Sequence, residues 1–125
     1  MTASNHDYLG TIEPARAELK RIVELGHVTY YKELSQKVGR HERWPKWKDV
    51  LDTMAHDRPD ISIIVLNADS GWPGQIDGKP VVEGKPSPQQ KVYAQAELDH
   101  VFKRYAPGKP TPTLPLPKRK NKAHS

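Results

Sequence analysis

The chain has 125 residues, 35% of them hydrophobic, which is enough for one domain with a modest core. The absence of cysteine excludes thiol nucleophiles, disulfides and thiolate zinc sites, and the net charge is +5. Because no apolar run approaches the roughly 20 residues of a membrane span and no signal-peptide pattern stands at the N-terminus, we expect a soluble, cytoplasmic protein.

The positive charge is unevenly distributed along the chain. The segment from Pro107 to Ser125 contains no acid and five cations, Lys109, Lys118, Arg119, Lys120 and Lys122. The remaining residues carry 15 cations and 15 anions. Within this balanced part, five cations lie close together in the sequence against a single acid, Glu42: they are Lys37, Arg40, Arg43, Lys46 and Lys48. The sequence therefore predicts a folded body with one basic end.

The first helix is predicted to begin near Pro14, because proline suits a first helical turn, and to follow a flexible leader of residues 1 to 10. Its core-facing side is formed by apolar residues at spacings of three and four, Ile12, Ala15, Leu19, Ile22 and Val23. Gly26 follows the last turn, where a left-handed cap is favoured.

Two further short helices are predicted in tandem. The second runs from Tyr30 to Val38, with Thr29 as its N-cap and Gly39 at its end. The third runs from Pro45 to about His56, with an apolar stripe formed by Trp47, Val50, Leu51 and Met54.

The second half of the chain predicts a strand, a hairpin and a helix. Residues 61 to 67, ISIIVLN, are rich in β-branched side chains and predict a buried strand. Residues 75 to 85, QIDGKPVVEGK, predict a hairpin that turns at Asp77-Gly78. Ser87-Pro88-Gln89-Gln90 fits a capping box that opens a final helix. Prolines and basic residues beyond Ala106 predict a disordered tail over residues 107 to 125.

This order of elements predicts a small α+β domain over residues 11 to 106. It is the order of a winged helix-turn-helix, here with three short helices, a β-hairpin wing and a C-terminal helix. In that fold the third helix enters a groove of DNA and the hairpin lies beside the backbone, so the architecture favours DNA binding.

Two stretches are similar to a known family. Val28-Thr29-Tyr30-Tyr31, Glu33-Leu34 and Gly39 resemble the V-T-T-Y-G-x-L-A motif and following glycine in the DNA-binding domain of O6-alkylguanine-DNA alkyltransferases and alkyltransferase-like proteins. Ile63 to Gly71 resembles the family's apolar strand and N-x-x-G wing. The resemblance covers roughly residues 12 to 105 and implies a DNA-binding scaffold.

The same resemblance implies a role for Tyr31, which matches the family's tyrosine beside the phosphate of a flipped nucleotide. The sequence lacks the family's reactive cysteine and its P-x-H-R motif, so alkyl transfer is excluded on chemical grounds. Leu66 to Gly74 is also similar to an L-V-V-N-x-x-T-G-x-P-G pattern of small uncharacterised bacterial and phage proteins with a Y-x-E-L element, a likeness that implies no function.

Six residues are predicted to contact DNA: Tyr31, Arg40, Arg43, Trp44, Lys46 and Lys48. The four cations surround the start of the third helix, where cationic side chains and unpaired backbone N–H groups favour a phosphate. An ordinary solvated charged face is the alternative interpretation. Trp44 is the candidate for stacking on bases, whereas Trp47 is expected in the core. The histidines lack metal-ligand spacing, so neither a metal nor a cofactor is expected.

We therefore expect a non-catalytic protein that binds duplex DNA in preference to single strands, with the basic tail adding sequence-independent attraction. Two alternatives stay open. Asp60 with Asp77-x-Lys79 or Glu83-x-Lys85 superficially fits the PD-(D/E)xK pattern of metal-dependent nucleases. The Pro-rich tail also fits a polyproline ligand, which would make the protein an interaction module.

Overall fold

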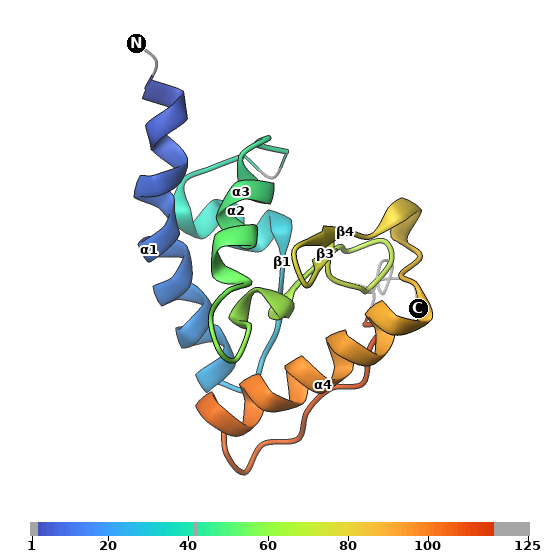
Figure 1. The fold of residues 1–125 in the computed structure, drawn as a ribbon. Coiled ribbons are helices and arrows are strands. Elements are labelled where there is room, and N and C mark those ends of the chain that lie inside the picture. Colours follow the sequence, from blue (N-terminus) through green and yellow to red (C-terminus); the bar gives the residue numbers. More distant parts are fainter. Residues whose placement is uncertain (1–2, 42, 117–125) are drawn as a thin grey trace, which may run out of the picture.

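The structure, a computed structural model, describes residues 3 to 41 and 43 to 116. Over these residues it is a mixed α and β domain, with helices α1 (Ala3–Glu24), α2 (Tyr31–Val38), α3 (Trp47–Met54) and α4 (Pro88–Tyr105), and two short 3₁₀ helices, η1 (Ile61–Ile64) and η2 (Val82–Gly84). The long α1 runs along one side with α2 and α3 beside it, and α4 crosses the lower part of the view (Figure 1). The expected α+β class is confirmed, and none of the described helices is long and apolar enough to cross a bilayer.

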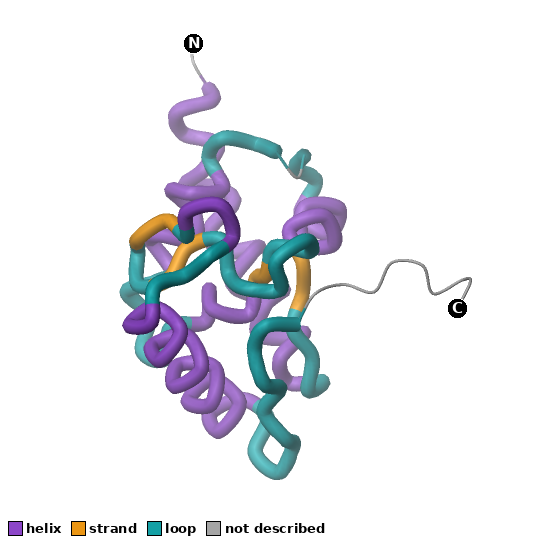
Figure 2. Tube along the Cα trace, turned by 90° about the vertical axis from the view of Figure 1, so that its right-hand side faces the viewer, coloured by secondary structure: helices purple, strands orange, loops and turns teal. Residues whose placement is uncertain are grey.

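Two sheets of two short strands complete the described part (Figure 2). β1 (Thr29–Tyr30) pairs in parallel with β2 (Val65–Leu66). β3 (Gln75–Ile76) and β4 (Lys79–Pro80) form the predicted antiparallel hairpin. Asp77 and Gly78 turn it with φ angles of 58° and 75°, the left-handed conformations that a two-residue hairpin of type I′ requires.

The core lies where α1, α3, α4 and η1 meet. The predicted apolar face of α1 and the predicted stripe of α3 are both buried. Phe102 on α4, Leu19 on α1 and Ile63 in η1 are among the largest side chains that are completely enclosed. Hydrophobic burial of these faces is the main force that assembles the helices.

The predicted start of α1 at Pro14 is wrong. The helix begins at Ala3 and therefore includes residues 3 to 10 of the expected leader. Pro14 removes the hydrogen bond to the carbonyl of Gly10, which is exposed and therefore accessible to water. The helical turn before Pro14 is stabilised by contacts with other parts of the fold. Thr11 and Ile12 are buried, and Arg40 Nε donates to Thr11 Oγ1 at 3.1 Å. Tertiary contacts thus override the local signal.

The predicted limits of α2 are confirmed at its end and wrong at its start. Gly39 adopts a φ of 77° and its N–H donates to the carbonyl of Ser35, the expected left-handed cap. Thr29 is not the N-cap, because it and Tyr30 pair as β1 with Val65 and Leu66. Tyr30 is the residue that precedes the first helical turn.

The strand predicted over residues 61 to 67 is wrong for its first half. Ile61–Ile64 form the 3₁₀ helix η1, and only Val65–Leu66 form the strand β2. Asp60 Oδ1 accepts hydrogen bonds from the backbone N of Ser62 at 3.0 Å and from its Oγ at 2.6 Å, which closes the turn. The β-branched residues here serve burial, since all four residues of η1 are buried.

The predicted capping box of α4 is confirmed. Ser87 Oγ accepts from the backbone N of Gln90 at 3.1 Å, and Gln90 Oε1 accepts from the backbone N of Ser87 at 2.8 Å. These reciprocal bonds satisfy two donors at the helix start and fix where α4 begins.

Residues 107 to 116, which we call the strap, run back along α4 (Figure 1). The side chain of Gln95 holds the strap twice, donating from Nε2 to the carbonyl of Pro112 at 3.0 Å and accepting at Oε1 from the backbone N of Leu114 at 2.8 Å. Leu114 is only 6% exposed. The prediction of a disordered tail is therefore wrong for the strap, and residues 117 to 125 lie outside the described residues.

Candidate nucleic-acid interface

The loop between α2 and α3 is organised by two tryptophans. Trp47 is 3% exposed, as predicted for a core residue, and its Nε1 donates to the carbonyl of His41 at 3.0 Å. The Trp44 ring meets the Trp47 ring edge to face, with centroids 5.5 Å apart. This geometry is a favoured one for aromatic pairs, so the loop is anchored to the start of α3.

Arg40 and Trp44 form a pair within the fold. The Arg40 guanidinium carbon lies 4.5 Å from the centroid of the half-buried Trp44 ring, a cation–π contact, and Arg40 Nε donates to Thr11 on α1. Arg40 thus connects the loop to α1. Its guanidinium also covers one face of the Trp44 ring, which was expected to stack on bases. Both predicted DNA contacts have structural roles.

The exposed side of α3 carries mixed charge. Lys48 is exposed, and its Nζ lies 3.2 Å from Asp52 Oδ2 one turn later. Asp49 and Asp52 are half-buried on the same helix, and Thr53 is exposed. Lys46 is the half-buried residue immediately before the helix. Two aspartates so close to Lys46 and Lys48 weaken the attraction of this helix for a phosphate.

Tyr31 opens α2 and packs against the turn before β3. A methyl group placed on Gly74 would come within 2.6 Å of the Tyr31 hydroxyl oxygen, so the ring and the backbone of that turn are in close approach. Burial, assisted by the negative charge of Asp52, raises the pKa of Tyr31 to about 12. The phenol is therefore a neutral hydrogen-bonding group over the physiological range.

A cleft of about 370 Å³ lies between the start of α2, the α2–α3 loop and the turn after β2. Its lining residues are Tyr30, Tyr31, Lys32, Arg43, Asn67, Ala68 and Asp69. Lys32 and Arg43 are both exposed, and Asp69 is the carboxylate of the lining. The lining thus combines two cations, one acid and two phenol groups, a set that suits an anionic, aromatic or hydrogen-bonding ligand.

The turn on the far wall of the cleft is fixed by Asn67. Its Oδ1 accepts from the backbone N of Asp69 at 2.8 Å, and its own carbonyl accepts from the N–H of Gly71 at 2.8 Å. The side-chain bond mimics a backbone turn, so the wall is set by local chemistry. This is the Asn67–Gly71 stretch in which the family resemblance was seen.

The six predicted site residues therefore separate into groups. Tyr31 and Arg43 line one cleft, Arg40 and Trp44 contact each other, and Lys46 and Lys48 flank the start of α3. Lys32, which directly follows Tyr31 and also lines the cleft, was not among the residues predicted from the sequence. Its position next to Tyr31 could have indicated Lys32. It was not chosen because it is separated in the sequence from the basic loop that contains the predicted cations.

The residues of the nuclease pattern serve other purposes. Asp60 is completely buried and accepts bonds from Ser62, and Asp77 is exposed in the hairpin turn. Among the side chains that the structure describes, no group of three His, Asp or Glu residues is arranged to hold a metal ion. The geometry therefore gives this pattern no support.

No protein-family model, curated protein or solved structure matches this chain.

Proposed function

We propose that the protein is a non-catalytic DNA-binding protein of winged helix-turn-helix type that binds duplex DNA. The order of its elements supports this, since α1 packs against both α2 and α3, and a β-hairpin follows them. The family resemblance around Tyr31 and Asn67 points in the same direction. The hairpin β3–β4 would lie beside the DNA backbone as the wing.

The observation that carries the proposal is the cleft, with Lys32 and Arg43 exposed at its edge. A cation that neutralises a phosphate releases a condensed counterion from DNA, which drives binding. Arg43 also presents several N–H donors in a fixed fork that matches phosphate oxygens. Tyr30 and Tyr31 add aromatic walls beside these two cations.

The charge on α3 indicates how the DNA is bound. Phosphate contacts position a protein on DNA, whereas base contacts in a groove supply specificity. Because α3 carries Lys48 against the two acids Asp49 and Asp52, and Lys48 lies against Asp52, the helix has no excess positive charge. We therefore expect binding that is dominated by phosphate contacts, strongly salt-dependent and modest in its sequence preference.

The interaction-module alternative is not favoured for the described residues. Leu114 is buried, and the carbonyl of Pro112 accepts a bond from Gln95, so these residues of the Pro-rich stretch are engaged with α4. A polyproline ligand must present such residues to its partner, which would first require the strap to detach.

The proposal is tested by titrating the tryptophan fluorescence of the full chain with duplex DNA. Arg43→Ala should weaken binding about three- to ten-fold near 0.1 M salt, because one phosphate contact is lost. Arg21→Ala is the matched control, since Arg21 is an exposed arginine of α1 that pairs with Glu18. Equal effects of the two substitutions would show that only net charge matters and would remove the cleft as the binding surface.

A further inference from the structure

An open groove of about 550 Å³ lies between the turn after α3 and the last turns of α4. More of its lining surface is apolar than polar, although most of the side chains that form it are ionisable. The lining residues are Arg58, Pro59, Glu97, His100, Lys103 and Arg104. None of them lines the cleft beside α2, so the groove is a separate surface of the domain.

The groove carries more positive charge than the cleft. Its lining contains three lysine or arginine residues and one acid, whereas the lining of the cleft contains two and one. Arg58, Lys103 and Arg104 are all exposed. Arg58 comes from the turn and the other two come from α4, so two separate elements bring positive charge to one hollow.

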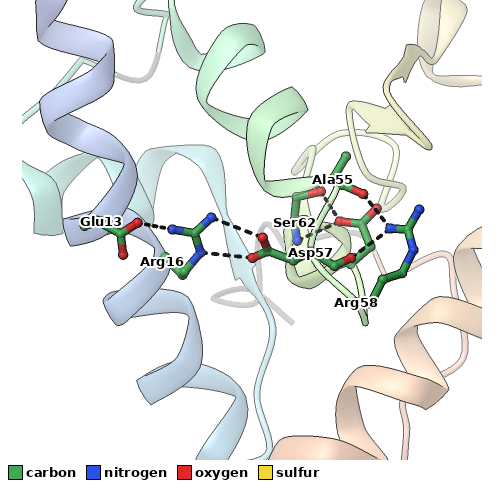
Figure 3. Close-up of polar contacts among 7 residues, drawn as sticks. Glu13, Arg16, Ala55, Asp57, Arg58 and Ser62 are labelled. Atoms are coloured by element: carbon green, nitrogen blue, oxygen red, sulfur yellow. Dashed lines mark hydrogen bonds and ion pairs between the residues drawn. The ribbon is translucent and has the colours of Figure 1, made fainter.

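Arg58 is fixed in position but retains donors for a ligand. Its Nη1 donates to the carbonyl of Ala55 at 2.9 Å and to that of Asp57 at 2.8 Å, and Figure 3 shows both bonds on this one nitrogen. No hydrogen bond joins its Nε or Nη2 to another described residue. The N–H groups of these two nitrogens form a rigid fork of the kind that binds a carboxylate through two parallel hydrogen bonds.

The acid of the groove is engaged within the domain. Glu97 Oε1 accepts from the backbone N of Asp60 at 3.1 Å, and Glu97 Oε2 lies 3.1 Å from His100 Nδ1. Both oxygens of the carboxylate therefore have partners, which offset part of the repulsion that Glu97 would exert on an anion in the groove.

The two cations of α4 differ in their partners. Lys103 Nζ lies 3.3 Å from Asp99 Oδ2 on the same helix. Arg104 forms no ion pair with a described residue, and its guanidinium carbon lies 5.8 Å from the centroid of the Tyr105 ring. Cations at the end of a helix offset the helix dipole, which accounts for their presence in the last turn of α4. The dipole does not account for the open fork of Arg58, which lies outside the helix.

We propose that this groove docks an acidic peptide segment of a partner protein, with carboxylates on Arg58 and Arg104 and an apolar side chain against Pro59. A carboxylate matches the geometry of a guanidinium group. Pro59 and the methylene stems of the cations provide apolar surface that such a side chain can cover. Because the groove shares no residue with the cleft, the inference goes beyond the proposed DNA binding and does not depend on it.

A peptide fits this groove better than nucleic acid does. Duplex DNA carries one negative charge per about 1.7 Å of its axis, so phosphates would lie close to Glu97 and Asp99 as well as to the cations. A peptide can place a few carboxylates opposite Arg58 and Arg104 and leave its other positions uncharged. Burial of an apolar side chain also uses the apolar part of the lining, which a phosphate backbone does not.

The test begins with selection from a random octapeptide library by the immobilised full chain near 0.1 M salt. The inference predicts that the selected peptides are enriched in Asp and Glu and contain at least one large apolar residue. The dominant peptide is then labelled, and its affinity for the full chain and for variants is measured by fluorescence anisotropy.

The groove variant Arg58→Gln/Arg104→Gln should bind this peptide about ten-fold or more weakly, because two charge-assisted contacts are lost. Lys20→Gln/Arg21→Gln is the matched control, which removes the same charge from exposed positions of α1 and should weaken binding by less than about two-fold. Arg104→Gln alone should still weaken binding by about three-fold, without disturbing the bonds of Arg58 to the turn.

The position of the peptide is checked by the backbone amide shifts of the full chain. The peptide should shift the amides of Arg58, His100 and Arg104 more than those of Lys32 and Arg43 in the cleft. Larger shifts at the cleft would overturn the inference.

Three other results would also overturn it. The first is a selection without acidic peptides, or equal binding of the selected peptide by the groove variant and the control. The second is a greater loss of duplex DNA binding in the groove variant than in the control, which would make the groove part of the DNA surface. The third is self-association that the groove variant abolishes, which would assign the groove to a second copy of the chain. A chain that binds the peptide at the groove but does not bind duplex DNA would remove the proposed function and support this inference.

Discussion

The turn from Ala55 to Ser62 and the cleft beside α2 are both rich in polar side chains, but they differ in where those side chains bond. In the turn, Asp57 binds Arg16 of α1, Arg58 donates to the carbonyls of Ala55 and Asp57, and Asp60 accepts from Ser62 (Figure 3). In the cleft, Lys32 and Arg43 are exposed to solvent. Charged residues counted along a sequence therefore do not locate a binding surface by themselves, because some of them are bonded within the fold.

The strap links this comparison to stability, because it runs along α4 to the cleft. Leu114→Ala should lower the free energy of unfolding by about 2 to 4 kcal/mol, since it removes a buried leucine and leaves a cavity. Val92→Ala on α4, at a position 71% exposed, should change it by less than about 0.5 kcal/mol. Urea unfolding followed by circular dichroism measures both, and equal stabilities would contradict the docked strap.

Asp60, in the turn from Ala55 to Ser62, is a completely buried acid whose protonation affects stability. Burial raises the pKa of Asp60 to about 6, assisted by the charge of Glu97 and opposed by the bonds from Ser62 and the charge of Arg58. The folded state therefore binds this proton more tightly than the unfolded state, in which the carboxyl keeps its ordinary pKa of 3.8. The stabilisation is complete below about pH 4 and is lost as the pH rises through 6.

The expected size of this pH effect on stability follows from the shift in the pKa of Asp60. Between pH 4 and pH 7 the wild-type chain should lose about 2 to 3 kcal/mol more stability than Asp60→Asn, which cannot titrate at this position. Val92→Ala, at an exposed position without a titratable group, should leave the pH profile parallel to that of the wild type. Parallel profiles for Asp60→Asn and the wild type would show that Asp60 is solvated in the folded state.

The ion pair of Arg16 and Asp57 gives a smaller effect. Arg16 Nε donates to Asp57 Oδ2 at 2.9 Å and the second amino group donates to Oδ1 at 3.1 Å, a two-pronged contact between α1 and the turn. Its partial burial should make Arg16→Ala cost about 1 kcal/mol. Arg21→Ala, which removes a local pair with Glu18 on the same helix, should cost less than Arg16→Ala, because solvent screens this exposed pair. Thermal unfolding at low and high salt compares them, and a larger loss for Arg21 would contradict this ranking.

Much of the fold was predictable from local signals. The spacing of Ile12, Ala15 and Leu19 indicated the buried face of α1, a signal that depends on helical periodicity. Ser87 with Gln90 indicated the start of α4, a signal that depends on contacts within a few residues. The 3₁₀ helix η1 was not predicted, because one side-chain cap from Asp60 overrides the β propensity of its three isoleucines.

The strap and part of the site escaped prediction for a different reason. The contacts of Gln95 with Pro112 and Leu114 join residues far apart in the sequence, and a proline-rich composition is typical of unpacked chains. Arg43, which the sequence singled out in the basic loop, lines the cleft, but its role in binding stays a prediction. The engagement of Arg40 with Trp44 and Thr11, and of Lys48 with Asp52, depended on distances that no sequence pattern encodes.

The most direct test of the proposed DNA-binding surface is the salt dependence of duplex binding in Lys32→Ala/Arg43→Ala, compared with Lys20→Ala/Arg21→Ala, which removes the same charge from exposed positions of α1. If both cleft cations contact phosphates, the slope of log K against log salt should become shallower by about 2 in the cleft variant, and the α1 variant should keep the wild-type slope. Equal slopes in the two variants, or a wild-type chain without affinity for duplex DNA, would contradict the proposal.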